Sequence, residues 1–152
     1  MTEPARKSLR RRLPLTAWSL AFVVAGCSAE RRALRKDGRE LDALGELVDH
    51  YWRDVRWGDP TRASACIESA EVRLAFQEWL GEEKDRVKYV DIQVVDVKLA
   101  PEAEEPTTDG HLRTATVTVR TEGYKLPEQI LEEHTLTQTW YKKDAGWYVE
   151  WP

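Results

Sequence analysis

Cysteine is scarce in this chain of 152 residues, and its scarcity limits how the fold can be stabilised. Only Cys27 and Cys66 are present. Two cysteines cannot build a framework of several disulfides, and they cannot supply a cysteine-based zinc cluster. An apolar core must therefore stabilise the domain, and six of the seven tryptophans follow Cys27 and are available to fill it.

The chain also lacks the motifs of several common enzyme and binding classes. It has no glycine-rich phosphate loop, no metalloprotease motif and no nucleophile-elbow motif. Basic residues do not predominate, because 23 Lys and Arg stand against 27 Asp and Glu. Nucleic-acid-binding domains usually carry a basic excess. We therefore expect no nucleic-acid partner, and nothing in the sequence calls for a cofactor.

No apolar stretch near the N-terminus is long enough to span a membrane as a helix. The candidate stretch, residues 13–27 (LPLTAWSLAFVVAGC), is uncharged and follows a run rich in Lys and Arg at residues 6–12. A spanning helix needs roughly 20 apolar residues. A basic start, a short apolar run and small residues at its end are typical of a secretory signal.

The end of that stretch, Val24-Ala25-Gly26-Cys27, resembles the lipobox of bacterial lipoproteins. The resemblance implies that residues 1–26 are a cleaved signal peptide and that the Cys27 sulfur carries a diacylglyceryl group. The alternatives are an uncleaved anchor and a chance small-small-Cys ending. We expect a cell-envelope protein held at a membrane by its lipid. Outer-membrane placement facing the periplasm is the default, because Ser28 is not the Asp that retains lipoproteins at the inner membrane in enterobacteria.

Removal of residues 1–26, which carry five Lys and Arg and one Glu, takes the formal net charge from −4 to −8. We interpret residues 27–39 as the lipidated cysteine and a short polar tether, whose basic side chains would lie near lipid headgroups. The alternative is that this segment is the first part of the next helix. Residues 40–152 then form one domain of ordinary size.

Apolar residues at three- and four-residue steps predict a helix over residues 40–57. Gly58-Asp59-Pro60 should end it, because Gly terminates helices and the residue before Pro disfavours helical angles. With Asp59 as N-cap, a short helix over residues 61–67 should follow. A third helix should begin at Ser69 or Ala70 and end near Gly81 or slightly beyond.

From Val87 the apolar period changes to two, which predicts strands. The first strand, residues 87–99, changes the face of its alternation partway along. A β-bulge near Val94 would reconcile its two halves and bend the sheet. An acidic loop and three further strands follow, at residues 112–122, 130–143 and 147–151. Helices followed by strands predict an α+β domain with an antiparallel sheet.

This order of elements is similar to the NTF2-like (SnoaL-like) superfamily. The shared features are a long amphipathic helix ending at Gly-Asp-Pro, short helices, a bent meander and the ending TWYKKDAGWYVEW, residues 139–151. The resemblance implies N-terminal helices packed on a strongly curved four-stranded antiparallel sheet, which forms an open cone. The alternative architecture is a cystatin-like sheet across one helix.

Some NTF2-like proteins are enzymes that use Asp, His and Tyr side chains inside the cone. Here His50 and Asp54, four residues apart on one helix, would suit a general base with its orienting carboxylate. Tyr51 would suit a hydrogen-bond donor, and Glu46 would add a metal contact beside His50. The simpler interpretation is that these are ordinary contacts at the edge of a helix, with no metal site.

The tryptophans point more clearly to a binding role. We expect Trp52, Trp79 and Trp140 to fill the core, and Trp57 and Trp151 to line the mouth of a pocket. The sequence therefore predicts a membrane-anchored envelope lipoprotein whose domain binds a small apolar ligand or an envelope protein without catalysis. The competing hypothesis is an NTF2-like enzyme, of the isomerase or hydrolase type, acting on a small apolar substrate.

Overall fold

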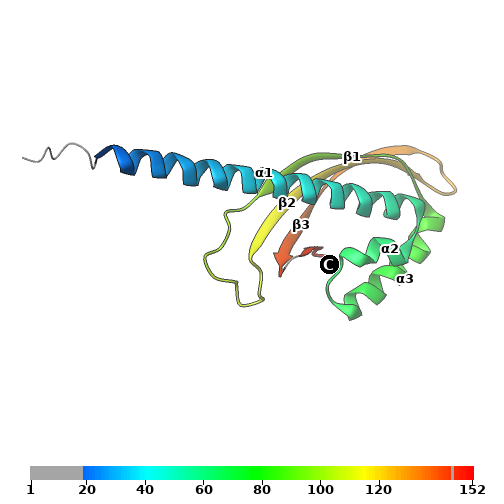
Figure 1. The fold of residues 1–152 in the computed structure, drawn as a ribbon. Helices are drawn as coiled ribbons and strands as arrows, with labels where there is room; N and C mark the ends of the chain where they lie inside the picture. Colours follow the sequence, from blue (N-terminus) through cyan, green and yellow to red (C-terminus); the bar gives the residue numbers. More distant parts are fainter. Residues whose placement is uncertain (1–18, 145) are drawn as a thin grey trace, which may run out of the picture. The chain divides into compact units, whose positions relative to one another are not determined.

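The computed structural model describes the backbone of residues 19–144 and 146–152, and the side chains of this part from residue 31 onward. The chain divides into two compact units, residues 1–36 and Asp37–Pro152. In the described part of the first unit, the chain is helical from Ser19. The second unit contains three helices, a 3-10 turn and four strands (Figure 1).

Helix α1 extends from Ser19 to Trp57. Residues 28–38 are thus helical, which matches the second of the two interpretations of this segment. In the second unit, α1 buries one side, and its buried residues recur at three- and four-residue steps: Leu44, Val48, Tyr51, Trp52 and Val55. This spacing places them on one helical face, as the sequence predicted.

The end of α1 is confirmed at Gly58, whose φ of 64° lies in the left-handed region. Asp59 then caps the short helix α2, Pro60–Ala63, because its Oδ1 accepts a hydrogen bond from the Arg62 amide at 3.0 Å. A 3-10 turn, η1, covers Ser64–Cys66. Together α2 and η1 correspond to the predicted helix over residues 61–67.

Helix α3 extends from Ala70 to Arg86 and begins at the predicted N-cap, since the Ser69 side chain accepts from the Val72 amide. It ends five residues beyond Gly81, the approximate end that the sequence indicated. The charged residues 82–86 therefore form its last turn, where Lys84 and Arg86 complement the negative end of the helix dipole.

The four strands are antiparallel neighbours in the order β1-β2-β3-β4. Their bounds are Val87–Leu99, Arg113–Lys125, Leu131–Lys143 and Gly146–Val149. The predicted bulge is confirmed by a register shift between Val94 and Asp96. A second shift, between Tyr89 and Asp91, was not predicted. Bulges bend a strand, and β1, β2 and β3 curve along their length (Figure 1).

The core lies between the apolar side of α1 and one face of the sheet. Ala115, Val117 and Val119 of β2 are buried at alternate positions, as predicted, and Trp140 of β3 lies beside them. The Tyr51 ring meets the Trp140 ring edge to face, with their centroids 5.7 Å apart. Such aromatic pairs add stability beyond the apolar area that they bury.

Trp52 and Trp140 are buried, as expected. Trp79, expected in the core, instead keeps 37% of its surface exposed. It lies on α3 and packs against the rings of Phe76 and Trp151. Phe76 and Leu80 are the buried residues of α3. Trp79, three residues after Phe76, lies at the margin of that buried face, so part of its ring stays exposed.

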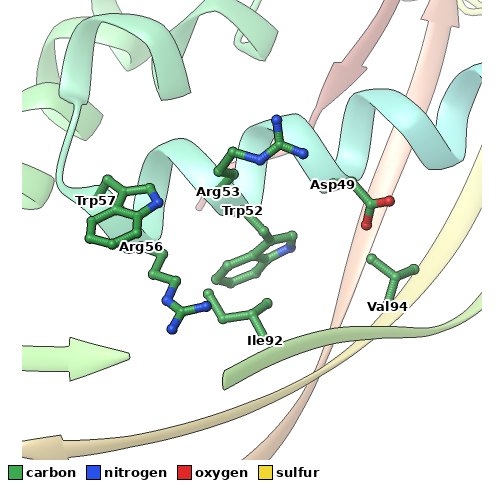
Figure 2. A pocket seen from close by; sticks show the side chains of 7 residues that line it. All are labelled: Asp49, Trp52, Arg53, Arg56, Trp57, Ile92 and Val94. Carbon is green, nitrogen blue, oxygen red and sulfur yellow. The ribbon is translucent and has the colours of Figure 1, made fainter. Parts of the chain in front are cut away.

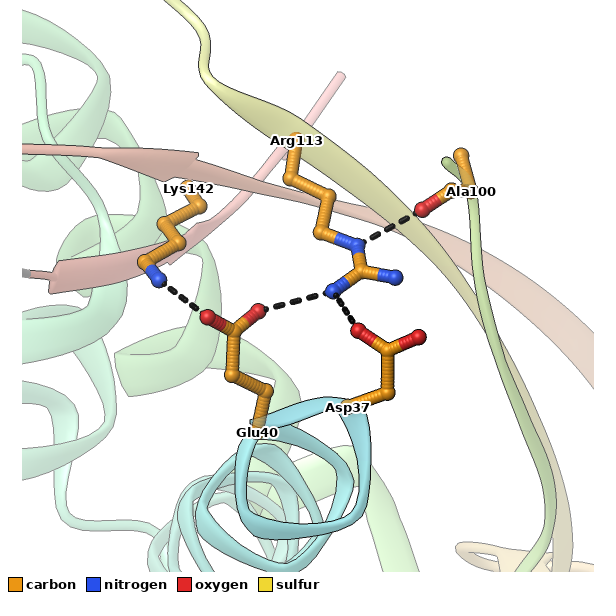
Figure 3. Close-up of polar contacts among 5 residues, drawn as sticks. All are labelled: Asp37, Glu40, Ala100, Arg113 and Lys142. Atoms are coloured by element: carbon orange, nitrogen blue, oxygen red, sulfur yellow. Dashed lines mark hydrogen bonds and ion pairs between the residues drawn. The ribbon is translucent and has the colours of Figure 1, made fainter. Parts of the chain in front are cut away.

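A charged cluster joins the start of the second unit's helix to the sheet. Arg113, almost fully buried, donates through Nη1 to Asp37 at 2.7 Å and to Glu40 at 3.0 Å (Figure 3). Its Nε donates to the Ala100 carbonyl, and Lys142 donates to the second oxygen of Glu40 at 2.6 Å. Burial opposes ionisation of Glu40, but the hydrogen bonds from Lys142 and Arg113 outweigh it, and its pKa is lowered.

Candidate functional site

The structure does not assemble His50, Asp54 and Tyr51 around one cavity. His50 is exposed, and its Nδ1 lies 3.5 Å from Nη1 of Arg53. Asp54 forms an ion pair with Arg62, with Oδ1 3.6 Å from Nε. Among the described residues, no hydrogen bond joins His50 to Asp54. A general base and its orienting group need that contact.

Tyr51 is 3% exposed and belongs to the core. Burial raises the pKa of its hydroxyl, and a hydrogen bond with Gln138 offsets this only in part. Gln138 also accepts a hydrogen bond from Nε1 of Trp52 at 3.0 Å. The Gln138 amide thus satisfies polar atoms of two aromatic side chains inside the domain, and this arrangement fixes their orientation.

The larger of two described concavities that contain a predicted ligand residue is a groove between α1 and β1, with a volume of about 310 Å³. We call it the Trp57 groove, and Figure 2 shows its lining. Helix α1 contributes Asp49, Trp52, Arg53, Arg56 and Trp57, and strand β1 contributes Ile92 and Val94. Its volume is at the lower end of the range of small-molecule sites.

Among the described residues, Trp57 is the most exposed large apolar side chain, with 76% of its surface exposed. The Arg56 guanidinium lies 5.7 Å from the centre of the Trp57 ring, within the range of a cation–π contact. Arg56 also extends toward β1 (Figure 2), and its Nη2 donates a hydrogen bond to the Val90 carbonyl. These contacts hold a cation and an exposed aromatic ring together at the mouth of the groove.

The cations of the domain are of two kinds, those paired with a carboxylate and those without such a partner among the described residues. Arg113, Lys142 and Lys143 each lie within 3.0 Å of a carboxylate. By contrast, within the described part of the chain neither Arg53 nor Arg56 forms an ion pair with a carboxylate. A guanidinium has five N–H donors, so most donors of these two side chains are available to a ligand.

Trp151, the other predicted ligand residue, lines a separate cleft of about 240 Å³ between η1, α3 and the C-terminal strands. Here the Tyr141 hydroxyl donates to Glu68 at 3.0 Å, and Lys143 donates to the other Glu68 oxygen at 2.6 Å. The hydrogen bonds from Lys143 and Tyr141 lower the pKa of Glu68. Burial and the Glu68 hydrogen bond raise the pKa of Tyr141 to about 12. Glu68 is thus already satisfied by two partners.

A third cleft, of about 210 Å³, lies on the inward face of the sheet near the β2–β3 connection. Tyr89, Thr121 and Leu136 line it, with His134 and Glu132 at its rim. His134 is largely exposed, and its Nε2 lies 3.3 Å from Glu132. A His with a single carboxylate contact and no second base beside it gives no sign of acid–base chemistry.

The structure was also compared with the sequence predictions for lipidation, membrane spanning and metal binding. The lipidation predicted at Cys27 concerns a side chain outside the described ones. Among the described residues, no helix is long and apolar enough to cross a membrane. In the same part of the chain, no group of three His, Cys, Asp or Glu side chains is placed to hold a metal ion.

Sequence reasoning singled out Trp57 but missed Arg53, Arg56 and their partners on β1. The signal was present in residues 49–57, DHYWRDVRW, where each arginine directly follows or precedes a tryptophan. Arg53 and Arg56 are three residues apart and therefore lie on the same side of a helix. The contribution of Ile92 and Val94 required knowledge of how β1 packs beside α1.

Comparison with known proteins adds no relative. No protein-family model matches the chain, and neither a curated protein nor a solved structure is significantly similar to it.

Proposed function

We propose that this chain is a lipoprotein of the bacterial cell envelope, anchored through Cys27, whose NTF2-like domain binds a ligand or partner without catalysis. The anchor is supported by the order of a basic run, a short apolar run and the Val-Ala-Gly-Cys ending. The NTF2-like assignment is supported by helices that precede an antiparallel sheet bent at two bulges. The acidic domain would then lie outside the cytoplasm, held at the outer membrane by default.

The observation that carries the binding role is the Trp57 groove. An apolar floor, an exposed tryptophan and a few convergent polar groups are the usual elements of a binding site. Tryptophan and arginine are also the residues that contribute most to protein–protein binding. The groove offers no base held by a second group, and so its chemistry favours recognition over turnover.

Site-specific photo-crosslinking in living cells tests this role. A benzoylphenylalanine side chain replaces Trp57 in the full-length protein, and a matched control carries it at Thr137, an exposed position on β3. We expect a discrete adduct from position 57 that position 137 does not give. We also expect the additional substitution Arg56→Gln to reduce it. Identical adducts from both positions, or none from position 57, would refute binding in the groove.

A further inference from the structure

Strand β1 is an edge strand, and its free edge adjoins the Trp57 groove. It pairs only with β2 within the described part of the chain. On its other side, the Val90 carbonyl accepts a hydrogen bond from the Arg56 side chain. A backbone acceptor at this edge is therefore oriented toward a donor outside the sheet. Edges of this kind can pair with an additional extended segment.

We propose that the occupant of the Trp57 groove is an acidic polypeptide segment in extended conformation, which pairs with the free edge of β1. This inference rests on the proposed binding function and specifies its partner. The backbone of the segment would replace Arg56 as the donor to the Val90 carbonyl. The Arg56 guanidinium would then be released to bind an acidic side chain.

The two bulges define how much of the edge is usable. Register shifts at Val90 and at Val95 interrupt β1 and divide its regular pairing with β2 into three short stretches, Val87–Tyr89, Asp91–Val94 and Asp96–Leu99. Bulges at an edge protect it from unrestricted sheet extension. The segment would therefore pair over a short stretch, and side-chain contacts in the groove must supply the remaining affinity.

The positive charges of the groove indicate that the bound segment is acidic. Arg53 and Arg56 outnumber Asp49, the one carboxylate among the residues that line the groove, although the chain as a whole is acidic. Hydrogen bonds between guanidinium and carboxylate are stronger than neutral ones, and Arg often makes them in pairs. An extended segment alternates its side chains, so an acidic residue can face the arginines while an apolar neighbour contacts Trp57.

Fluorescence anisotropy with synthetic peptides tests the proposal on the full chain, purified from membranes in a non-ionic detergent. The probe is a short, dye-labelled peptide that alternates Glu and Val. Two control peptides replace Glu with Lys, or carry N-methyl groups on alternate backbone nitrogens. Methylation removes the backbone donors that edge pairing needs and keeps the side chains.

We expect the Glu-Val peptide to bind at least about tenfold more tightly than either control. The double variant R53Q/R56Q should lose a similar factor. The variant R31Q/R32Q, with the same change in charge at exposed positions outside the groove, should bind normally. Equal binding of the N-methylated peptide would overturn edge pairing, and equal binding of the Lys-Val peptide would overturn the acidic specificity.

The outcomes separate this inference from the proposed function. If the photo-crosslink from position 57 captures a lipid or another small molecule, the groove binds but the peptide inference fails. If position 57 gives no specific adduct, the proposed function itself fails. A Glu-Val peptide that does not bind while position 57 crosslinks a protein also rejects the edge-pairing mode.

Discussion

At the scale of single residues, arginine serves two different ends in this domain. Arg113 is 6% exposed, and its donors are taken by Asp37, Glu40 and a backbone carbonyl. Arg53 and Arg56 are exposed and have no carboxylate partner among the described residues. A buried charge held by two carboxylates and a carbonyl is a structural element, whereas exposed donors beside an apolar groove are available for recognition.

Substitution of Arg113 should therefore destabilise the domain strongly. Arg113→Met removes the buried cation that Glu40 and Asp37 share and leaves Glu40 with Lys142, and breaking a buried pair costs about 3 kcal/mol of unfolding free energy or slightly more. Urea unfolding followed by tryptophan fluorescence measures it. The control Arg120→Met removes a half-exposed pair with Glu133 and should cost less than about 1 kcal/mol. Equal losses would contradict the structural role of Arg113.

Glu40 should make stability depend on pH on the acid side. Its pKa is lowered in the folded state, so the folded protein holds its proton less tightly than the unfolded chain. The stabilisation is complete above the unfolded pKa of about 4.5 and is lost as the pH falls below it. In urea titrations at several pH values, Glu40→Gln should flatten this acid decline. The exposed loop variant Glu104→Gln should retain it, and a parallel decline in all three proteins would refute the prediction.

At the scale of the elements, the end of α1 positions the Trp57 groove. Trp57 is the last residue of the helix, and Gly58 reverses the chain immediately afterwards. The Gly58 amide bonds to the Val55 carbonyl and the Asp59 amide to the Asp54 carbonyl, which closes the last turn. The groove therefore depends on where the helix stops.

Two glycine substitutions, one within α1 and one directly after its end, should have opposite effects on stability. Gly58→Ala places a Cβ on a residue with a φ of 64°, at 2.9 Å from the Lys84 side chain, and should cost about 1–2 kcal/mol. Gly45→Ala lies in the helix interior with nothing within 4 Å of the new Cβ, and should add about 0.5–1 kcal/mol. Urea midpoints measure both. A shift in the same direction for the two variants would contradict the structure around Gly58.

Elements with a strong local signal were predictable from sequence, and features that depend on packing were not. The stop at Gly58-Asp59-Pro60 and the bulge near Val94 follow from residue types and from an apolar alternation that changes face. The second bulge, at Val90, is hidden in the sequence, because Val90 continues an apolar alternation with Ile92 and Val94, whereas in the structure Val90 is exposed and Tyr89 packs against the core. The groove likewise joins α1 to β1, and no single stretch of sequence contains it.

At the scale of the whole molecule, the lipid anchor predicted from the sequence would act together with the binding groove proposed on the domain. A lipid on Cys27 would confine the domain to a membrane surface. There, partners held at the same surface meet it at a raised effective concentration. A shallow groove with modest intrinsic affinity would then suffice for function.

Lipidation at Cys27 is tested by metabolic labelling with a palmitate analogue. We expect the wild-type protein to take up the label, because the resemblance to the lipobox implies acylation at that residue. Cys27→Ser should remain unlabelled, whereas Cys66→Ser, which changes the buried cysteine, should be labelled normally. Equal labelling of the wild type and Cys27→Ser would exclude the predicted anchor.

The most direct test of groove binding is mass spectrometry of the molecules that co-purify with the full-length protein from membranes. The account predicts that a specific polypeptide is retained by the wild type and by R31Q/R32Q, and is lost from R53Q/R56Q. Because all three chains share residues 1–30 and both cysteines, the comparison isolates the groove. Retention of the same molecules by all three proteins, or of none by the wild type, would contradict the account.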